Sequence, residues 1–377
     1  MRWVVLYTGA RMGYAVPAML ARRGLLERFY TDAHAPTWLP ASLASLPLLP
    51  RGVSRLLGRR LPPELEGKVA SVPLAARDEE RLRARVLADG FGEAGGLYTL
   101  TAADLPVVRA AKERGLRVVH EQIIAPHVGR EVRSERLAYP GLEPLVPEAE
   151  IEAGIARDIE QWRLADVVLA PSEHVREEVA SHGIPPDRLR VVPYGVPEAW
   201  LETTPTPEPG RLLFVGSVVL RKGVQHLAAA SRLLRSRGLG HRARVVGPVG
   251  VAHRAHPALA GVELVGQVPR ARVREEFLMG DIFVFPTLAE GCALVHLEAL
   301  ACGLPVVTTP ACGSVVRDGV EGFIVPPRDP EALAERVAKL LGDRDLRARM
   351  SAAARARARE FTWAGYGDRL FAALPEA

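Results

Sequence analysis

Short runs of β-branched and aromatic residues alternate with helical segments along the whole chain, and this alternation limits the fold more than any other feature. In the first half, the runs cover 2–7, 95–101, 116–121, 165–171 and 188–194. In the second half, they cover 211–217, 242–247, 262–266, 281–287, 304–309 and 321–327. Such alternation is typical of a parallel sheet with helices on both faces. The sequence therefore predicts an α/β fold.

A proline-rich stretch separates the two sets of runs. Residues 192–210 contain five prolines, as expected of a linker between domains. A chain of 377 residues, 48% of them hydrophobic, can form two cores. We expect two doubly wound, Rossmann-like domains facing each other across a cleft, with bounds 1–192 and 211–355, a linker 193–210, and a C-terminal helix in 356–377 that packs back on the first domain. Such sheets bind ligands at the carboxyl ends of their strands, so the cleft is the expected site.

Composition and missing motifs exclude several classes of protein. The three cysteines, at 292, 302 and 312, form no CxxC pair, which favours core residues in a reducing cytosol over a metal site or disulfides. The stretch TGARMG (8–13) has the wrong spacing for a dinucleotide-binding loop, and no P-loop pattern occurs. The net charge of +5 comes without a basic block or zinc-finger spacing, so we expect no nucleic-acid partner. No signal peptide or membrane-spanning run is visible, and we expect a cytoplasmic protein.

Two glutamates frame the stretch EGCALVHLEALACGLPVV, which follows the predicted strand 281–287. Glu290 lies in the loop after that strand, and Glu298 lies eight residues later inside a predicted helix. Helical rise separates them by about 12 Å at most, so they cannot act as a paired acid and base on one small group. They could instead hold two parts of one long ligand.

The helix between the two glutamates begins with backbone N–H groups that can bind an anion. These groups belong to Gly291, Cys292, Ala293 and Leu294. A ligand with a sugar, a diphosphate and a ribose, in that order, would fit Glu290, the helix start and Glu298.

A second loop places a hydroxyl and two cations at the end of another strand. In FVGSVVLRKG (214–223), Ser217 is followed by Arg221 and Lys222 at the start of a helix. By itself this pattern is also typical of a polar loop with surface charges. In the same domain as the glutamates, it provides a second source of positive potential for one diphosphate.

These motifs resemble those of the retaining glycosyltransferases of family 4, which have the GT-B fold. That family carries two glutamates separated by seven residues, then an Ala-rich helix and Gly-x-Pro-Val, as in 290–307, and a Val-Gly loop before Lys-Gly, as in 215–223. The resemblance also covers 318–341 and the Phe-Thr-Trp at 361–363. It is strong over 190–377 and looser in the first half.

The resemblance implies a role for each matching residue. Glu290 would hold hydroxyls of the transferred sugar, and Glu298 would hold the ribose. Ser217, Arg221 and Lys222 would bind the diphosphate together with the N–H groups of Gly291, Cys292, Ala293 and Leu294, and the backbone near Val268 would meet the base. Many members have Arg where this chain has Ser217. The implied catalytic residues are Lys222, Arg221 and Glu290. His120, Glu121 and His127, in the segment 118–130, are candidate bases, and equally candidates for strand-end polar groups that bond locally.

The implied activity is retaining transfer from a UDP-, GDP- or ADP-sugar to a hydroxyl of a glycan or lipid-linked acceptor, without a metal or other cofactor, in bacterial cell-envelope glycan or glycolipid synthesis. A sugar-nucleotide epimerase, a glycan phosphorylase and a catalytically inactive nucleotide-sugar-binding protein are alternatives on the same fold. The transition state would place charge on the departing diphosphate, so cations there should dominate catalysis.

Two features of the first half belong to the acceptor side. The loop after the first strand, with Gly9, Arg11 and Gly13, would border the acceptor and the diphosphate. Residues 33–63 contain no acidic residue and interleave basic with apolar side chains. This composition suits peripheral contact with the inner face of a membrane, and equally a small insert folded on the domain.

Overall fold

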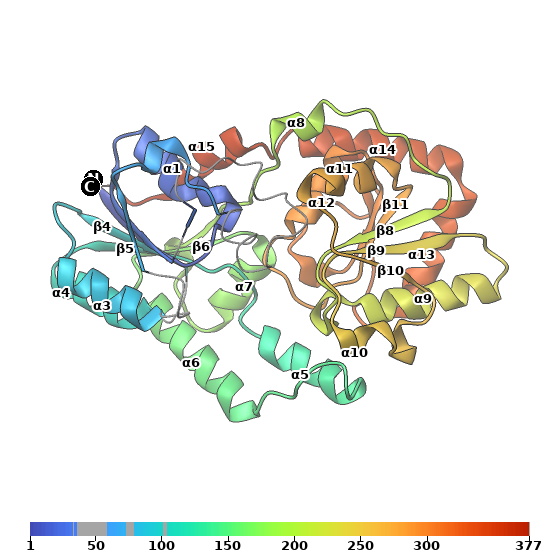
Figure 1. Cartoon of the computed structure of the whole chain (residues 1–377), viewed down its shortest axis with the longest axis horizontal. Helices are drawn as coiled ribbons and strands as arrows, with labels where there is room; N and C mark the ends of the chain where they lie inside the picture. The colour runs from blue at the N-terminus through green and yellow to red at the C-terminus, as the bar shows by residue number, and fades with distance from the viewer. Residues whose placement is uncertain (33, 36–58, 73–78, 101–103, 377) are drawn as a thin grey trace.

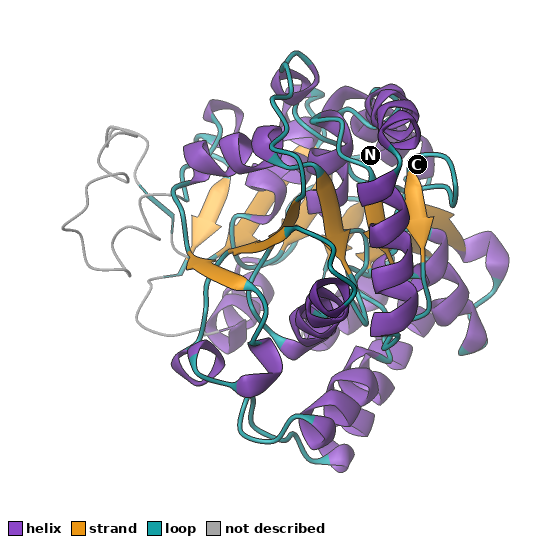
Figure 2. Ribbon diagram, turned by 90° about the vertical axis from the view of Figure 1, so that its right-hand side faces the viewer, coloured by secondary structure: helices purple, strands orange, loops and turns teal. Residues whose placement is uncertain are grey.

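The computed structural model describes residues 1–32, 34–35, 59–72, 79–100 and 104–376. Two parallel sheets lie side by side in this part of the chain, each with its own helices (Figure 1). In the view of Figure 2, the strands form a middle layer with helices above and below it. The predicted α/β class with two Rossmann-like domains is confirmed. Most of the segment 33–63 lies outside the described residues.

The first sheet has seven strands in the order β3-β2-β1-β4-β5-β6-β7, all parallel. The strands are β1 (Trp3–Leu6), β2 (Leu26–Thr31), β3 (Val69–Ser71), β4 (Gly96–Thr99), β5 (Arg117–Glu121), β6 (Val167–Ala170) and β7 (Leu189–Val191). The helices are α1 (Ala15–Arg22), α3 (Glu79–Asp89), α4 (Leu105–Glu113), α5 (Val128–Ala138), α6 (Glu148–Leu164) and α7 (Glu173–Ser181). The order reverses between β1 and β4, and ligands bind at such a switch point in open α/β sheets.

The second sheet has six strands in the order β10-β9-β8-β11-β12-β13, again all parallel. The strands are β8 (Arg211–Val215), β9 (Arg242–Val246), β10 (Glu263–Gly266), β11 (Ile282–Phe285), β12 (Val306–Thr308) and β13 (Gly322–Ile324). The helices that accompany it are α9 (Val224–Ser236), α10 (Val251–Arg254), α11 (Arg270–Met279), α12 (Leu294–Ala301), α13 (Pro330–Gly342) and α14 (Arg344–Ala358). The central strands β8 and β11 are buried along their whole length, and apart from Arg211 at the start of β8 their residues are all apolar, as expected for strands covered on both faces.

The linker and the end of the chain run together between the domains. The short helix α8 (Glu198–Leu201) follows the point where the chain passes from the first domain to the second. Just before this helix, the N–H of Val196 donates to the carbonyl of Phe361 at 2.8 Å. The last helix, α15 (Trp363–Ala373), lies beside α1 of the first domain (Figure 1). The guanidinium of Arg23 sits 3.6 Å above the ring of Phe371. The C-terminal helix therefore packs on the first domain, after the chain has completed the second.

Candidate active site

A cavity of about 340 Å³ lies between the two domains, and residues from both line it. The lining residues are Arg11, Met12, Ile123, Tyr194, Lys222, Glu290, Cys292, Ala293, Leu294 and Val295. Their loops follow β1, β5, β7, β8 and β11. The carboxyl ends of strands in both sheets thus meet at one place, as the alternation pattern predicts.

Lys222 and Glu290 line the cavity and form an ion-paired cluster with Arg221, which does not itself line it. A carboxylate oxygen of Glu290 lies 2.7 Å from a guanidinium nitrogen of Arg221 and 3.3 Å from Nζ of Lys222. The Arg221 guanidinium also donates to the carbonyl of Ala289 at 2.6 Å. The sequence predicts that Glu290 binds the sugar and that the two cations bind the diphosphate. The structure brings all three side chains into direct contact.

Local backbone geometry explains why the two cations sit at this strand end. After β8, residues Leu220–Lys222 form a single 3₁₀ turn, called the donor turn below. The turn ends at Gly223, whose φ is +74°, and α9 begins at the next residue. A Cβ at Gly223 would lie 1.9 Å from the carbonyl oxygen of Pro286, so only glycine fits this crossing. Ser217, in contrast, is exposed and does not line the cavity.

The start of α12 also lines the cavity, through Leu294 and Val295. The helix begins at Leu294, and its first N–H groups have no acceptor within the helix. Cys292 and Ala293 line the cavity with it. Gly291 lies at the domain boundary, where its carbonyl accepts the hydroxyl hydrogen of Ser172 at 2.6 Å.

Two predicted donor contacts lie away from this cavity. Glu298 is 5% exposed inside α12, and its charge contributes to raising the pKa of the Cys302 thiol, which burial raises to about 12. Val268 is half-buried after the end of β10. Glu298 lies in the predicted helix and Val268 follows the predicted strand, but neither residue lines the cavity that contains Glu290.

His120 and His127 both lie outside the lining of this cavity. His120 is 1% exposed; its Nδ1 accepts from the side-chain amide of Gln161 at 2.8 Å, and its Nε2 donates to the side-chain oxygen of Gln122 at 3.2 Å. Burial lowers the pKa of His120 to about 4, so the ring is neutral and both nitrogens are occupied. His127 lies 3.1 Å from a carboxylate oxygen of Glu178, outside the cavity lining. In this structure neither His120 nor His127 lines the cavity that contains Glu290.

The loop after β1 presents Arg11 to the cavity by means of left-handed backbone. Met12, Gly13 and Tyr14 have φ values of +49°, +64° and +63°. Upstream, the N–H of Gly9 donates to the carboxylate of Asp32 at 2.8 Å and fixes the other end of the loop. Left-handed residues with side chains are uncommon outside functional loops. Gly9 and Gly13 therefore shape the loop, and Arg11 lines the cavity.

Sequence reasoning missed Tyr194 as a cavity residue. Its hydroxyl donates to the carboxylate of Glu121 at 2.7 Å, and Tyr98 donates to the other carboxylate oxygen. Burial raises the pKa of Glu121, which is 3% exposed. Both Glu121 and Tyr194 come at the end of predicted strand runs, 116–121 and 188–194, so their position at the carboxyl edge was a usable signal.

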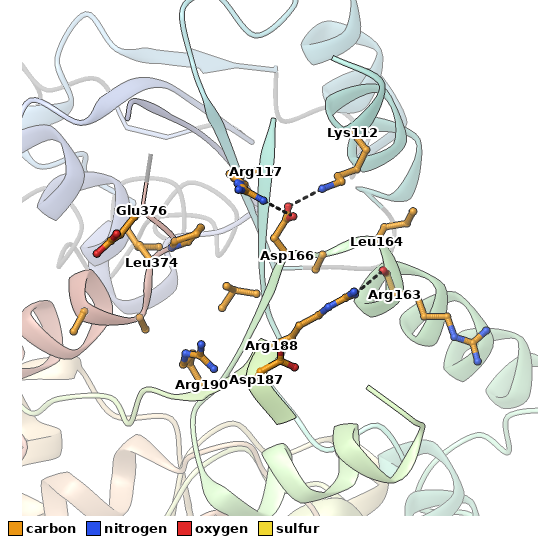
Figure 3. A pocket seen from close by; sticks show the side chains of 15 residues that line it. Lys112, Arg117, Arg163, Leu164, Asp166, Asp187, Arg188, Arg190, Leu374 and Glu376 are labelled. Carbon is orange, nitrogen blue, oxygen red and sulfur yellow. Dashed lines mark hydrogen bonds and ion pairs between the residues drawn. The ribbon is translucent and has the colours of Figure 1, made fainter. Parts of the chain in front are cut away.

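A larger hollow, of about 740 Å³, lies elsewhere on the first domain (Figure 3). Its cations include Lys112, Arg117, Arg188 and Arg190. Lys112 and Arg117 lie 2.8 and 3.4 Å from the carboxylate of Asp166, which neutralises part of this charge. The hollow lies at the amino ends of β5, β6 and β7, the edge of the sheet opposite to the cavity. It contains none of the predicted site residues.

Within the described ranges, no group of three or more His, Cys, Asp or Glu side chains could hold a metal ion. The described part of the chain also contains no helix that is long and apolar enough to cross a membrane.

Comparison with known proteins identifies two matching family models. "Glycosyl transferases group 1" matches residues 209–343, and "Glycosyltransferase Family 4" matches residues 146–200. Alpha-maltose-1-phosphate synthase of Mycolicibacterium smegmatis is 29% identical over 72% of this chain and 81% of its own length. D-inositol 3-phosphate glycosyltransferase of Xylanimonas cellulosilytica is 31% identical over 52% of this chain, which spans about half (53%) of that relative. The fold is similar to that of Anabaena HepE in complex with UDP and glucose, with a TM-score of 0.67, 17% identity, and coverage of 99% of this chain and 98% of HepE.

Proposed function

This chain belongs to glycosyltransferase family 4, and we propose that it transfers a sugar from a nucleoside-diphosphate sugar to a hydroxyl acceptor with retention of anomeric configuration. One observation carries the proposal: Lys222 and Glu290, ion-paired with each other and with Arg221, line a cavity together with the start of α12 and with Arg11 of the other domain. Two cations and a helix N-terminus beside a carboxylate suit a ligand that joins an anionic group to hydroxyls.

The diphosphate would take the position of counter-charge to Arg221 and Lys222. In the structure Glu290 supplies that counter-charge at 2.7 and 3.3 Å. Donor binding would release the Glu290 carboxylate to accept hydrogen bonds from sugar hydroxyls. The start of α12 would add roughly 1–2 kcal/mol of stabilisation to a partly buried phosphate.

The same groups would act on the transition state, in which the sugar becomes cationic and the diphosphate departs. Charge develops on the phosphate oxygens, where Lys222 and Arg221 can donate charge-assisted hydrogen bonds. In a front-face mechanism the departing phosphate takes the proton of the acceptor hydroxyl, so no side-chain base is needed. This agrees with His120, which is sealed in the core. The two cations can supply the charge that a divalent metal would otherwise supply, and we propose a metal-independent reaction.

Assignments beyond the cavity follow the family pattern. Glu298 is proposed to contact the ribose and the backbone at Val268 the base, with UDP, GDP and ADP as the candidate nucleotides. HepE, which has the same fold, was solved with UDP and glucose, which supports including UDP in the test. The acceptor is proposed to be a glycan or lipid-linked molecule in bacterial glycan synthesis.

A thermal-shift panel of UDP-, GDP- and ADP-sugars tests the donor assignment. One class should raise the melting temperature of the wild-type chain, since a ligand that binds only the folded state stabilises it. The same sugar nucleotide should leave the melting temperature of Lys222→Ala unchanged. Equal stabilisation of both proteins would remove Lys222 from the donor site. Product analysis with and without acceptor separates transfer from epimerisation and from binding without catalysis.

A second part of the proposal concerns the acceptor side. The basic and apolar composition of residues 33–63 supports a peripheral location on the inner face of the membrane. Co-sedimentation with anionic liposomes tests it, by comparing wild type with a chain in which Arg51, Arg55, Arg59 and Arg60 are replaced by serine. The wild type should pellet with the liposomes and the variant should remain in the supernatant. Equal pelleting would remove the membrane contact.

A further inference from the structure

We propose that Glu143, in the connection between α5 and α6 of the first domain, is a positioning residue for the donor turn of the second domain. Through it, the approach of the two domains would order the turn that carries Arg221 and Lys222. This inference rests on the proposed function, because it assumes that those two cations bind the donor.

The first contact joins Glu143 to the backbone of the donor turn. A carboxylate oxygen of Glu143 accepts the N–H of Leu220, the first residue of the turn, at 2.6 Å. The Glu143 side chain is 12% exposed, and its other carboxylate oxygen forms an ion pair with Arg136 at 3.2 Å. A charged acceptor at this distance makes a strong hydrogen bond to a backbone N–H group.

A second contact holds the carbonyl of the same residue. The side-chain amide of Gln225 donates to the carbonyl of Leu220 at 2.9 Å and to a carboxylate oxygen of Glu135 at 2.8 Å. Glu135 belongs to α5, and its side chain is 3% exposed. The N–H and the carbonyl of Leu220 are therefore both tied to carboxylates of the first domain, one directly and one through Gln225.

Glu135 is itself fixed by residues of the second domain on two sides. Its carboxylate lies 3.1 Å from Nε2 of His226 and 2.6 Å from Nε of Arg328. Arg328 reaches this position from left-handed backbone, with φ of +61°, and also pairs with Glu131 at 2.6 Å. Figure 1 shows α5 extending from the first domain towards α10 of the second. The clasp formed by Glu135, Gln225, His226 and Arg328 joins the domains beside the donor turn.

Different residues of the donor turn contact the first domain and the cavity. Leu220 is held by the first domain, whereas Lys222 lines the cavity and Arg221 pairs with Glu290. Glu143 does not line the cavity, so any effect on donor binding must pass through the turn. When the domains separate, the Leu220 N–H exchanges a carboxylate for water, and the turn loses a restraint on the two cations.

The test is calorimetric titration of UDP, GDP and ADP into the full chain. For the nucleotide that binds wild type best, Glu143→Ala should weaken binding about tenfold, the range expected when one hydrogen bond to a charged group is lost. Glu143→Gln keeps an oxygen that can accept the Leu220 N–H and should bind within about twofold of wild type. Glu152→Ala removes an exposed carboxylate of α6 that pairs with Arg130, and should bind as wild type does.

Lys222→Ala distinguishes the two levels of the proposal. If Lys222→Ala loses binding while Glu143→Ala retains it, the donor assignment stands and the positioning role is wrong. If wild type and Lys222→Ala bind alike, the proposed function fails and the positioning role fails with it. Melting curves of each variant separate a local effect from unfolding. The inference is supported if Glu143→Ala melts like wild type but binds the nucleotide about tenfold more weakly, and if Glu143→Gln restores the affinity. Weak binding in Glu143→Gln as well would overturn it.

Discussion

Replacing Gly291 by alanine should act as a wedge between the two domains. A Cβ at this position would lie 1.9 Å from the carbonyl oxygen of Ile123 and 3.1 Å from the ring of Pro171, both in the first domain. Real Cβ atoms are essentially never closer than 3.0 Å to another heavy atom, so the domains must part here by at least about 1 Å. The obstacle is backbone and cannot rotate away. The hydrogen bond from Ser172 to the carbonyl of Gly291, now 2.6 Å, would stretch at the same time.

The magnitude follows from the sensitivity of catalysis to position. A misplacement of about 1 Å can cost on the order of 10²-fold in rate, or about 2.7 kcal/mol. We expect kcat of Gly291→Ala to fall by about that factor, while the affinity for the nucleoside diphosphate falls by less than about tenfold, because Arg221 and Lys222 lie in the second domain. The assay is steady-state release of nucleoside diphosphate, with calorimetric titration for affinity. Gly240→Ala is the matched control, since nothing lies within 4 Å of its added Cβ. A wild-type kcat for Gly291→Ala would refute the reasoning that the reaction needs the domains this close.

Three further outcomes are expected. Chelators should leave turnover unchanged; a requirement for added Mg²⁺ would contradict the metal-independent mechanism. Burial lowers the pKa of His120 from 6.5 to about 4, so the unfolded chain binds the proton of His120 more tightly than the folded chain does. The neutral ring of His120 therefore contributes about 3 kcal/mol to the free energy of unfolding. This contribution is complete above pH 6.5 and is lost as the pH falls from 6.5 towards 4. Urea midpoints over this range should fall less steeply in His120→Gln, and an equal slope would show that His120 is not the titrating group. Burial raises the pKa of the Cys292 and Cys302 thiols to about 12 and that of Cys312 to about 11, so iodoacetamide at pH 8 should label the native chain far more slowly than the urea-unfolded chain; equal rates would contradict this burial.

The location of the site was predictable because it depends on the ends of parallel strands. Arg11, Lys222 and Glu290 each follow a recognisable strand run, and such loops gather at one edge of a sheet. The alternation of runs therefore predicts both domains and the cleft between them. The glycine at position 223 also has a local physical reason, because its backbone passes so close to Pro286 that a Cβ would not fit.

Contacts that depend on the relative placement of the domains were not predictable. Glu143 and Leu220 are 77 residues apart and belong to different sheets, and no periodicity links them. The direction in which a side chain points from a buried strand or helix was equally unpredictable from the sequence. His120 at the end of β5 turns into the core, and Glu298 is buried within α12 rather than lining the cavity. Glu290 contacts both cations because the loop after β11 meets the donor turn after β8. The number of residues between these two segments does not reveal how close they lie in space.

Acceptor-dependent release of nucleoside diphosphate, measured for wild type and Lys222→Ala with the sugar nucleotide that stabilises the wild type, tests the central claim most directly. The account predicts release by the wild type that requires acceptor, and release at least about 10²-fold slower by Lys222→Ala, the loss typical of removing one preorganised donor to developing charge. Equal rates in the two proteins would contradict the claim that the cluster of Arg221, Lys222 and Glu290 is the site of transfer.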